Sequence, residues 1–334
     1  MSRRPVILAV TMGDAGGIGP EIALKAVYGH RWPSDLRFVV LGSMPVARQI
    51  ARRFRFPLPV EIASLDRPLT AKVSLYDSRP GGRLVVKYGV PAVGAARAAV
   101  AWIRAAAGAC LSGRLDGMVT APISKEGLWR AGLASSGHTE LLAELAGTRR
   151  FGMMLMGGGL KVVLATRHIP LASVPRKLRA ETIIDAAELA SEALAWFGER
   201  GGTVGVCALN PHAGDGGAIG TEEQRVILPA LKRLKRRGVK VEGPVPADVI
   251  FYRALRGDYG AVVALYHDQG LGPLKMLAFE TGVNVTLGLP FVRTSPDHGT
   301  AFDIAGKGIA NASSMVEAIR VAYRLARRPN PWRP

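Results

Sequence analysis

Five of the six histidines in this 334-residue chain lie in polar segments that contain glycine. Three of them, His168, His212 and His267, each follow an apolar, strand-like run. Three imidazoles at adjacent strand ends can bind one divalent ion and leave positions open for a substrate. The alternative is three independent turn histidines, because separations of 44 and 55 residues match no local ligand motif.

Residues 13–21 (Gly-Asp-Ala-Gly-Gly-Ile-Gly-Pro-Glu) form a second candidate segment after the first strand-like run. Their spacing is not that of G-x-G-x-x-G, and no acidic residue ends a second strand about 20 residues further on. They also lack the Gly-Lys-Ser/Thr of a P-loop. The sequence predicts a tight turn into a helix that begins near Gly19 and Pro20, with a Rossmann-type turn as the less favoured alternative.

Strand-like and helix-like segments alternate along the chain. We expect strands at residues 6–10, 36–41, 117–119, 203–209, 261–265 and 283–287. We expect helices after residue 19 and at residues 45–54, 93–111, 181–197, 222–235 and 315–326. This alternation predicts an α/β protein with a largely parallel sheet. Residues 150–166 break the rhythm and predict two strands joined by glycines, an antiparallel arm.

Polar clusters follow several of these strands, at residues 11–19, 120–125, 167–168, 210–217 and 267–270. Ligands bind at the carboxyl edge of open α/β sheets. The clusters therefore predict one binding edge.

The composition supports a folded chain, with 48% hydrophobic and 21% charged residues. The first apolar run is too short for a signal-peptide core, and no run approaches the roughly 20 residues of a membrane span. Cys110 and Cys207 stand in apolar contexts and are expected to be buried free thiols. We expect a cytoplasmic location and no membrane partner.

The formal net charge of +18 raises the question of an anionic partner. The clearest basic run, residues 232–237, stops at Gly238 and ends a helix-like segment, where cations offset the helix dipole. A solvated helix end is favoured over a nucleic-acid patch, because the sequence shows no nucleic-acid motif.

Residues 298–311 (His-Gly-Thr-Ala-Phe-Asp-Ile-Ala-Gly-Lys-Gly-Ile-Ala-Asn) resemble the adenine-binding loop of the isocitrate and isopropylmalate dehydrogenases. Glycines let backbone approach a cofactor. The Asp303 carboxylate can accept hydrogen bonds from both ribose hydroxyls and repel a 2′-phosphate, which favours NAD over NADP. The cofactor residues expected from this resemblance are Gly299, Thr300, Asp303, Ile304 and Asn311.

Four more segments, at residues 137–144, 209–214, 266–270 and 282–295, extend the resemblance. Together they resemble the 4-hydroxythreonine-4-phosphate dehydrogenase family from residue 11 to about residue 311. The resemblance implies an isocitrate/isopropylmalate-dehydrogenase-like two-domain α/β/α fold. It also implies a homodimer with active sites at the subunit interface, and one divalent cation (zinc, magnesium, cobalt or manganese) on His168, His212 and His267.

The same resemblance implies that the substrate is bound by His138, Thr139, Lys275, Asn284 and Arg293. We expect a cofactor-side domain formed by residues 1–125 and 291–334. Residues 126–290 are expected to form a central domain with the metal ligands and dimer contacts.

The expected reaction oxidises the secondary hydroxyl of a phosphorylated hydroxy acid, and the β-keto acid formed loses carbon dioxide. A divalent ion would lower the pKa of that hydroxyl. Lys275 and Arg293 would offset the charge of phosphate or carboxylate. Lys275 and Asp268 are the candidate catalytic residues, Asp268 through proton transfer or through orienting His267. Asp268 could instead cap a helix at residues 271–277.

Two features leave the substrate open. The first turn reads Gly-Asp-Ala where the family usually has Gly-Glu-Pro or Gly-Asp-Pro, and the Asp variant is commoner in a sister group that resembles 4-phospho-D-threonate and 4-phospho-D-erythronate dehydrogenases. Residues 120–123 also resemble this sister group slightly more. A metal-dependent hydrolase and a basic binding protein are the alternatives from other classes, and the loop at residues 303–311 argues against a hydrolase, which needs no nucleotide pocket.

Overall fold

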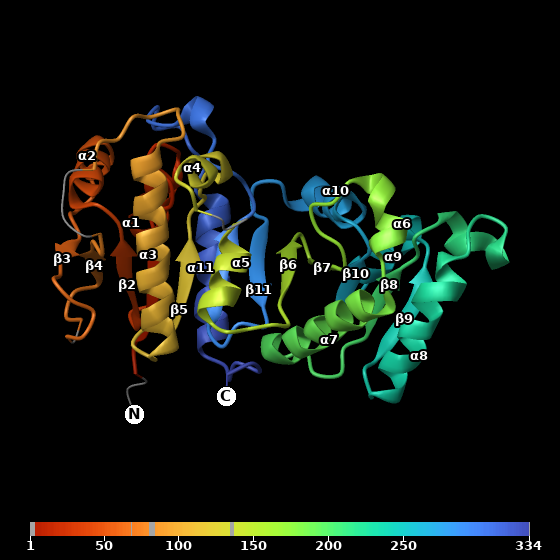
Figure 1. The fold of residues 1–334 in the computed structure, drawn as a ribbon. Helices are drawn as coiled ribbons and strands as arrows, with labels where there is room; N and C mark the ends of the chain where they lie inside the picture. The colour runs from red at the N-terminus through yellow and green to blue at the C-terminus, as the bar shows by residue number, and fades with distance from the viewer. Residues whose placement is uncertain (1–3, 68, 80–83, 134–136, 334) are drawn as a thin grey trace. The chain divides into compact units, whose positions relative to one another are not determined.

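The computed structural model describes residues 4–67, 69–79, 84–133 and 137–333. The chain forms two compact units (Figure 1). The first unit consists of Met1–Arg149 and Leu289–Pro334, and the second of Arg150–Gly288. Strands and helices alternate in both, which confirms the predicted α/β class.

The strands of the first unit are all paired in parallel, in the order β3-β4-β2-β1-β5-β12. They are β1 (Val6–Thr11), β2 (Leu36–Leu41), β3 (Val60–Glu61), β4 (Val73–Tyr76), β5 (Gly117–Thr120) and β12 (Val292–Pro296). The central strands are buried over nearly their whole length, because helices cover both faces of the sheet.

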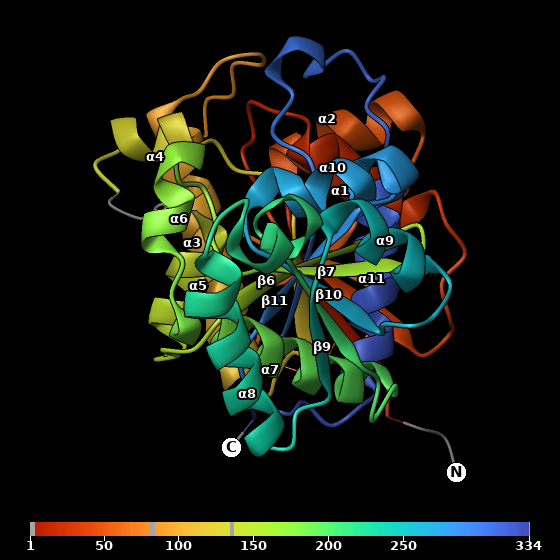
Figure 2. The same cartoon turned by 90° about the vertical axis from the view of Figure 1, so that its right-hand side faces the viewer.

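The helices of the first unit form two groups that lie on opposite sides of these strands (Figure 2). One group is α1 (Gly19–Tyr28), α2 (Met44–Phe54) and α11 (Ser313–Ala326). The other is α3 (Val93–Leu111), α4 (Lys125–Arg130) and α5 (His138–Leu145). The first turn leads into α1 with Pro20 in its first helical turn, as the sequence predicts.

Residues 126–149 belong to the first unit, whereas the sequence interpretation placed them in the central domain. The reason is apolar packing. Leu128 of α4 and Leu141 and Leu142 of α5 are buried in the same core as Trp102 and Ile103 of α3.

The second unit has the strand order β11-β6-β7-β10-β8-β9. Its strands are β6 (Gly152–Gly157), β7 (Leu160–Leu164), β8 (Val204–Cys207), β9 (Val241–Val245), β10 (Ala261–Ala264) and β11 (Val283–Leu287). β6 is antiparallel to both β11 and β7, and Gly158 and Gly159 turn the β6–β7 hairpin with positive φ angles. The predicted antiparallel arm is thus confirmed, and the remaining pairs are parallel.

The helices of this unit are α6 (Val174–Lys177), α7 (Ala180–Phe197), α8 (Leu228–Arg236), α9 (Ala247–Leu255) and α10 (His267–Ala278). The basic run ends α8, with Arg233, Lys235 and Arg236 in the last turn and Arg237 as the C-cap, so it lies at a helix end as predicted. Two of its arginines pair with α7: Arg233 with Glu181 and Arg237 with Glu188, each at 2.7 Å.

Both cysteines are buried free thiols, as predicted, and burial raises the pKa of each. Within the described ranges, no helix combines the length and the apolar character needed to cross a membrane.

Candidate functional site

The three histidines singled out from the sequence follow three adjacent parallel strands of the second unit. The strands lie in the order β7-β10-β8. His168 comes four residues after the end of β7, His267 begins α10 shortly after β10, and His212 lies in the 3-10 segment η2 (Pro211–Gly217) after β8. The chain therefore brings all three to the same edge of this sheet.

His168 and His267 lie close together, with ring centroids 5.6 Å apart. Two imidazoles on one zinc ion would have ring centres about 5 Å apart, given metal–nitrogen distances of about 2 Å. Nδ1 of His267 lies 2.7 Å from Oδ1 of Asp268, a contact that orients the ring. Among the residues that the structure describes, no three His, Cys, Asp or Glu side chains are grouped closely enough to hold a metal. The imidazole nitrogens and the His168–His267 pair fit a divalent ion. His212 does not lie close enough to complete a group of three.

Buried polar side chains tie the three strand ends together. The Thr166 hydroxyl donates to the Leu265 carbonyl at 2.6 Å, which links the segments after β7 and β10. Gln269 accepts the Leu265 N–H and donates to the Ala208 carbonyl, both at 2.7 Å, which links the segments after β10 and β8. Gln269 stands in the Tyr-His-Asp-Gln-Gly motif, yet sequence reasoning gave it no role.

The loop that carries His212 has an uncommon backbone. His212, Ala213 and Asp215 have φ angles of 51°, 57° and 45°, in the left-handed region that L residues rarely adopt. Glu223 holds the start of this loop, because its Oε1 accepts the N–H groups of Leu209 and Asn210 at 2.8 Å. Burial alone would raise the Glu223 pKa, but these hydrogen bonds outweigh it and lower the pKa.

Asp268 does not cap a helix at residues 271–277, so that alternative is wrong. α10 begins at His267 with Tyr266 as its N-cap, which places Asp268 inside the first turn. Its side chain is 90% exposed.

The other two substrate candidates of the second unit lie on α10 and β11. Lys275 is half-buried, with Nζ 5.5 Å from the centre of the Phe279 ring. Asn284 lies in β11 opposite Leu155, and its buried Oδ1 has no hydrogen-bond partner among the described residues. A buried acceptor without a partner is costly, which is typical of a ligand position.

The first unit contains a buried cation. Arg293 of β12 is 2% exposed, and its Nε and Nη2 donate to the Thr120 hydroxyl at 3.2 and 2.8 Å. Burial lowers the Arg293 pKa to about 10, against the opposing effect of the Glu140 carboxylate. The guanidinium therefore stays charged at neutral pH, although burial deprives the charge of hydrating water.

His138 and Thr139 open α5 beside this cation. Burial and the positive charge of Arg293 hold the His138 pKa well below its usual range, so the imidazole is neutral at neutral pH. Its Nε2 is shielded from solvent and lacks a hydrogen-bond partner within the described ranges. Thr139 is buried. Arg293, Thr120 and His138 can together receive an anion.

The predicted cofactor residues lie in the loop between β12 and α11. It contains the 3-10 turn η4 (Phe302–Ile304), with Asp303 exposed. The Thr300 carbonyl accepts the Ile18 N–H at 3.0 Å, which joins this loop to the first turn. At its far end, Oδ1 of Asn311 accepts the Ser313 N–H at the start of α11. Gly299 is exposed and Ile304 partly so.

Known proteins match nearly the whole chain. The family model described as "Pyridoxal phosphate biosynthetic protein PdxA" matches residues 34–322. A 4-hydroxythreonine-4-phosphate dehydrogenase of Geobacter metallireducens is 44% identical, over 96% of this chain and 95% of its own length. A D-threonate 4-phosphate dehydrogenase of Cupriavidus necator is 41% identical, over 96% and 98%.

The fold agrees with these sequence matches. The crystal structure of a 4-hydroxythreonine-4-phosphate dehydrogenase from Klebsiella pneumoniae superimposes with a TM-score of 0.86 at 38% identity, over 96% of this chain and all of that one. The chain belongs to the pyridoxal phosphate biosynthetic protein PdxA family.

Proposed function

We propose that this protein is an NAD-dependent, divalent-metal-dependent dehydrogenase. It oxidises the secondary hydroxyl of 4-(phosphooxy)-L-threonine, and the β-keto acid formed loses carbon dioxide, a step in pyridoxal 5′-phosphate biosynthesis. The observation that carries the proposal is the buried Arg293 guanidinium beside the neutral His138, in a chain whose relatives are named dehydrogenases of phosphorylated four-carbon acids. Those names also weaken the hydrolase and binding-protein alternatives.

The chain's own residues bind and orient the substrate. Arg293 holds the phosphate, because a guanidinium can give two parallel hydrogen bonds to an oxyanion. Neutral His138 and the Thr139 hydroxyl add hydrogen-bond donors without further charge. Lys275 contributes a second cation, and Asn284 fixes a polar group through Oδ1, which has no hydrogen-bond partner among the described residues.

His168, His212 and His267 would hold the divalent ion, with Asp268 orienting His267. When bound, NAD supplies the hydride acceptor and the ion supplies a Lewis acid that lowers the pKa of the substrate hydroxyl. Asp268, exposed and 2.7 Å from His267, would pass the proton of the substrate hydroxyl to water. Lys275 would offset the negative charge that remains on the substrate when carbon dioxide leaves.

D-threonate 4-phosphate is the second candidate substrate, because the Cupriavidus relative carries that name. The two compounds share the phosphate and differ at C2, which bears an amino or a hydroxyl group.

The first turn carries Asp14, the residue type that is commoner in the sister group. Asp14 is fully buried and accepts the Gly16 N–H at 2.9 Å, so it shapes that turn from inside.

A side-by-side assay tests the proposal. Metal-replete protein is given each phosphorylated acid with NAD, and NADH absorbance is followed. We expect the higher kcat/KM with 4-(phosphooxy)-L-threonine. A higher value with D-threonate 4-phosphate selects the second candidate, and no NADH with either compound rejects the dehydrogenase.

Asp303 is expected to select NAD over NADP. Asp303→Ala should raise the relative use of NADP by about tenfold or more, because the carboxylate that repels a 2′-phosphate is gone. The measurement is kcat/KM for each cofactor, with Asp303→Glu as a control that keeps the charge. An unchanged ratio in Asp303→Ala would remove this residue from the ribose site.

We also propose a homodimer with active sites at the subunit interface, located in the cytoplasm. Exposed apolar side chains at the C-terminal end of α10, Met276 at 83% and the C-cap Phe279 at 75%, support burial against another chain. The two buried free thiols support a reducing compartment.

A further inference from the structure

Side chains of α1 and α2 bind the backbone of residues 306–310, in the loop that resembles a cofactor-binding segment. Lys25 donates from Nζ to the carbonyls of Gly308 at 3.2 Å and Ala310 at 2.9 Å, and to Oε1 of Glu21 at 2.7 Å. The same Glu21 oxygen accepts the Ala310 N–H at 3.0 Å. All three ammonium protons of Lys25 therefore have acceptors.

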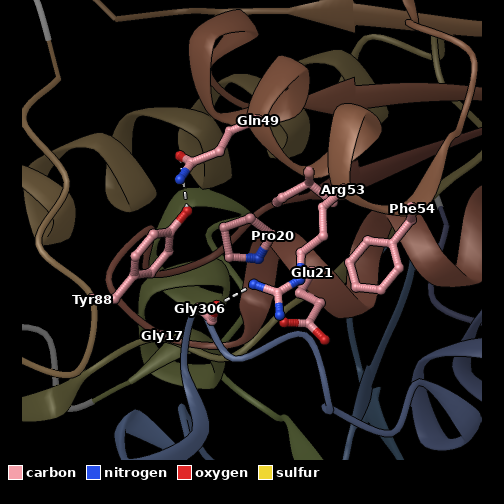
Figure 3. Close-up of a pocket in the computed structure, with 9 residues that line it drawn as sticks. Gly17, Pro20, Glu21, Gln49, Arg53, Phe54, Tyr88 and Gly306 are labelled. Carbon is pink, nitrogen blue, oxygen red and sulfur yellow. Dashed lines mark hydrogen bonds between the residues drawn. The ribbon is translucent and has the colours of Figure 1, made fainter.

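Arg53 of α2 extends this set of contacts toward the N-terminal side of the loop. Its Nη1 donates to the Gly306 carbonyl at 2.6 Å, and its Nη2 donates to the carbonyl of Lys307. Figure 3 shows the Arg53 guanidinium reaching Gly306 across a pocket that Phe54 and Tyr88 also line. We call Glu21, Lys25 and Arg53 the loop clamp.

Glycines allow the loop to lie this close to the clamp. Gly306 and Gly308 have φ angles of 76° and 77°. A Cβ at Gly308 would lie 2.3 Å from Nε of Arg53, and one at Gly306 would lie 2.9 Å from the Tyr88 ring. Gly308 thus lets the loop backbone lie against Arg53 of α2, and Gly306 lets it lie against Tyr88.

The contacts differ between the two sides of the loop. The carbonyls of residues 306, 307, 308 and 310 accept hydrogen bonds from the clamp, while the side chains of Asp303, Lys307 and Ile309 are exposed. Glu21 and Lys25 are mostly buried, with side chains 7% and 20% exposed, whereas Arg53 is exposed and lines the pocket of Figure 3. The three side chains have their printed contacts with the loop in common, so the loop is the route by which they act together on a ligand.

We infer that Glu21, Lys25 and Arg53 are positioning residues that hold residues 306–310 in the shape that binds the dinucleotide. This inference rests on the proposed function. A loop held in its binding shape before the cofactor arrives spares the ordering cost of binding, so the clamp strengthens NAD affinity through the loop.

Lys25→Met and Arg53→Met test the inference, because each keeps the aliphatic stem and removes the donors. We expect the NAD dissociation constant, measured by calorimetry, to rise about tenfold in each, since the loop must then be ordered on binding. Hydrogen exchange of the Ala310 amide should quicken in both. KM for the phosphorylated acid and kcat at saturating NAD should change less than about twofold. Arg53→Lys should recover part of the affinity.

Arg52→Met is the matched control, because Arg52 is the exposed neighbour of Arg53 on α2. Arg53 lies at the surface, so its variant tests the clamp even if Lys25→Met fails to fold. Wild-type NAD affinity in a folded Arg53→Met overturns the inference, as does a fall in kcat at saturating NAD with unchanged NAD affinity. A wild-type protein that binds neither NAD nor NADP overturns the proposed function and the clamp's role in it together.

Discussion

Arg293→Ala is expected to lower kcat/KM for the phosphorylated substrate by about thirty- to a thousandfold, the scale of one charge-assisted contact to a buried anion. A phosphate monoester carries close to two negative charges near neutral pH, and a partly dry site must offset them. Arg293 is 2% exposed and remains charged, since its pKa is lowered only to about 10. The NAD dissociation constant should change little.

Two controls separate anion binding from a general loss of structure. Arg97→Ala removes an exposed arginine from α3 and should leave kcat/KM within about twofold. Arg293→Lys keeps the charge but loses the planar guanidinium, so its kcat/KM should lie between those of wild type and Arg293→Ala. Steady-state kinetics and a cofactor titration on folded variants measure these effects on kcat/KM and on NAD binding. Intact turnover in Arg293→Ala, or a parallel loss of NAD binding, would show that Arg293 is not the phosphate anchor.

Removing Arg293 should not weaken the fold of the ligand-free protein by more than about 1 kcal/mol, because burial costs the guanidinium its hydration, the effect that lowers its pKa to about 10. Thermal unfolding of Arg293→Met, which keeps most of the side-chain volume, measures this. If the unfolding temperature falls steeply, the guanidinium is a structural group held by Thr120 and its neighbours.

Long periodic segments could be predicted well from the sequence. The helix at Val93–Leu111 and the strand at Val283–Leu287 match the prediction at both ends, because apolar residues continue to clear boundaries. Short elements were missed. β12, which carries Arg293, was not predicted, since Val292–Pro296 is polar in sequence although buried in the fold.

The sequence predicts the types of residue in the site better than it predicts the residues that hold them in position. Strand-end histidines are visible in a sequence because strands precede them. Glu223 and Gln269 hold the segments that carry His212 and His267 through backbone hydrogen bonds. In the sequence they look like ordinary residues of a helix, so periodicity gave no signal. The loop clamp was missed for the same reason, because Lys25 meets Gly308 across 283 residues of chain.

Chelation of the divalent ion is expected to abolish turnover, and a divalent metal should restore it. The proposal places the ion on His168, His212 and His267, of which two already lie with ring centroids 5.6 Å apart. His212→Ala should lower metal affinity by more than about a hundredfold, because loss of a direct ligand exceeds the tenfold to hundredfold cost of losing an outer contact. Competition with a chromogenic chelator measures this affinity without relying on activity.

His30→Ala is the matched control for the metal experiment, since His30 is an exposed histidine of the first unit and should leave metal affinity unchanged. The loop that holds His212 adds a finer expectation. Left-handed backbone at His212, Ala213 and Asp215 is kept in place partly by Glu223. Glu223→Gln should therefore weaken metal binding less than His212→Ala but clearly more than His30→Ala, because all three histidines remain while the loop relaxes. Full turnover in protein that elemental analysis shows to be free of metal, or unchanged metal affinity in His212→Ala, would reject the three-histidine site.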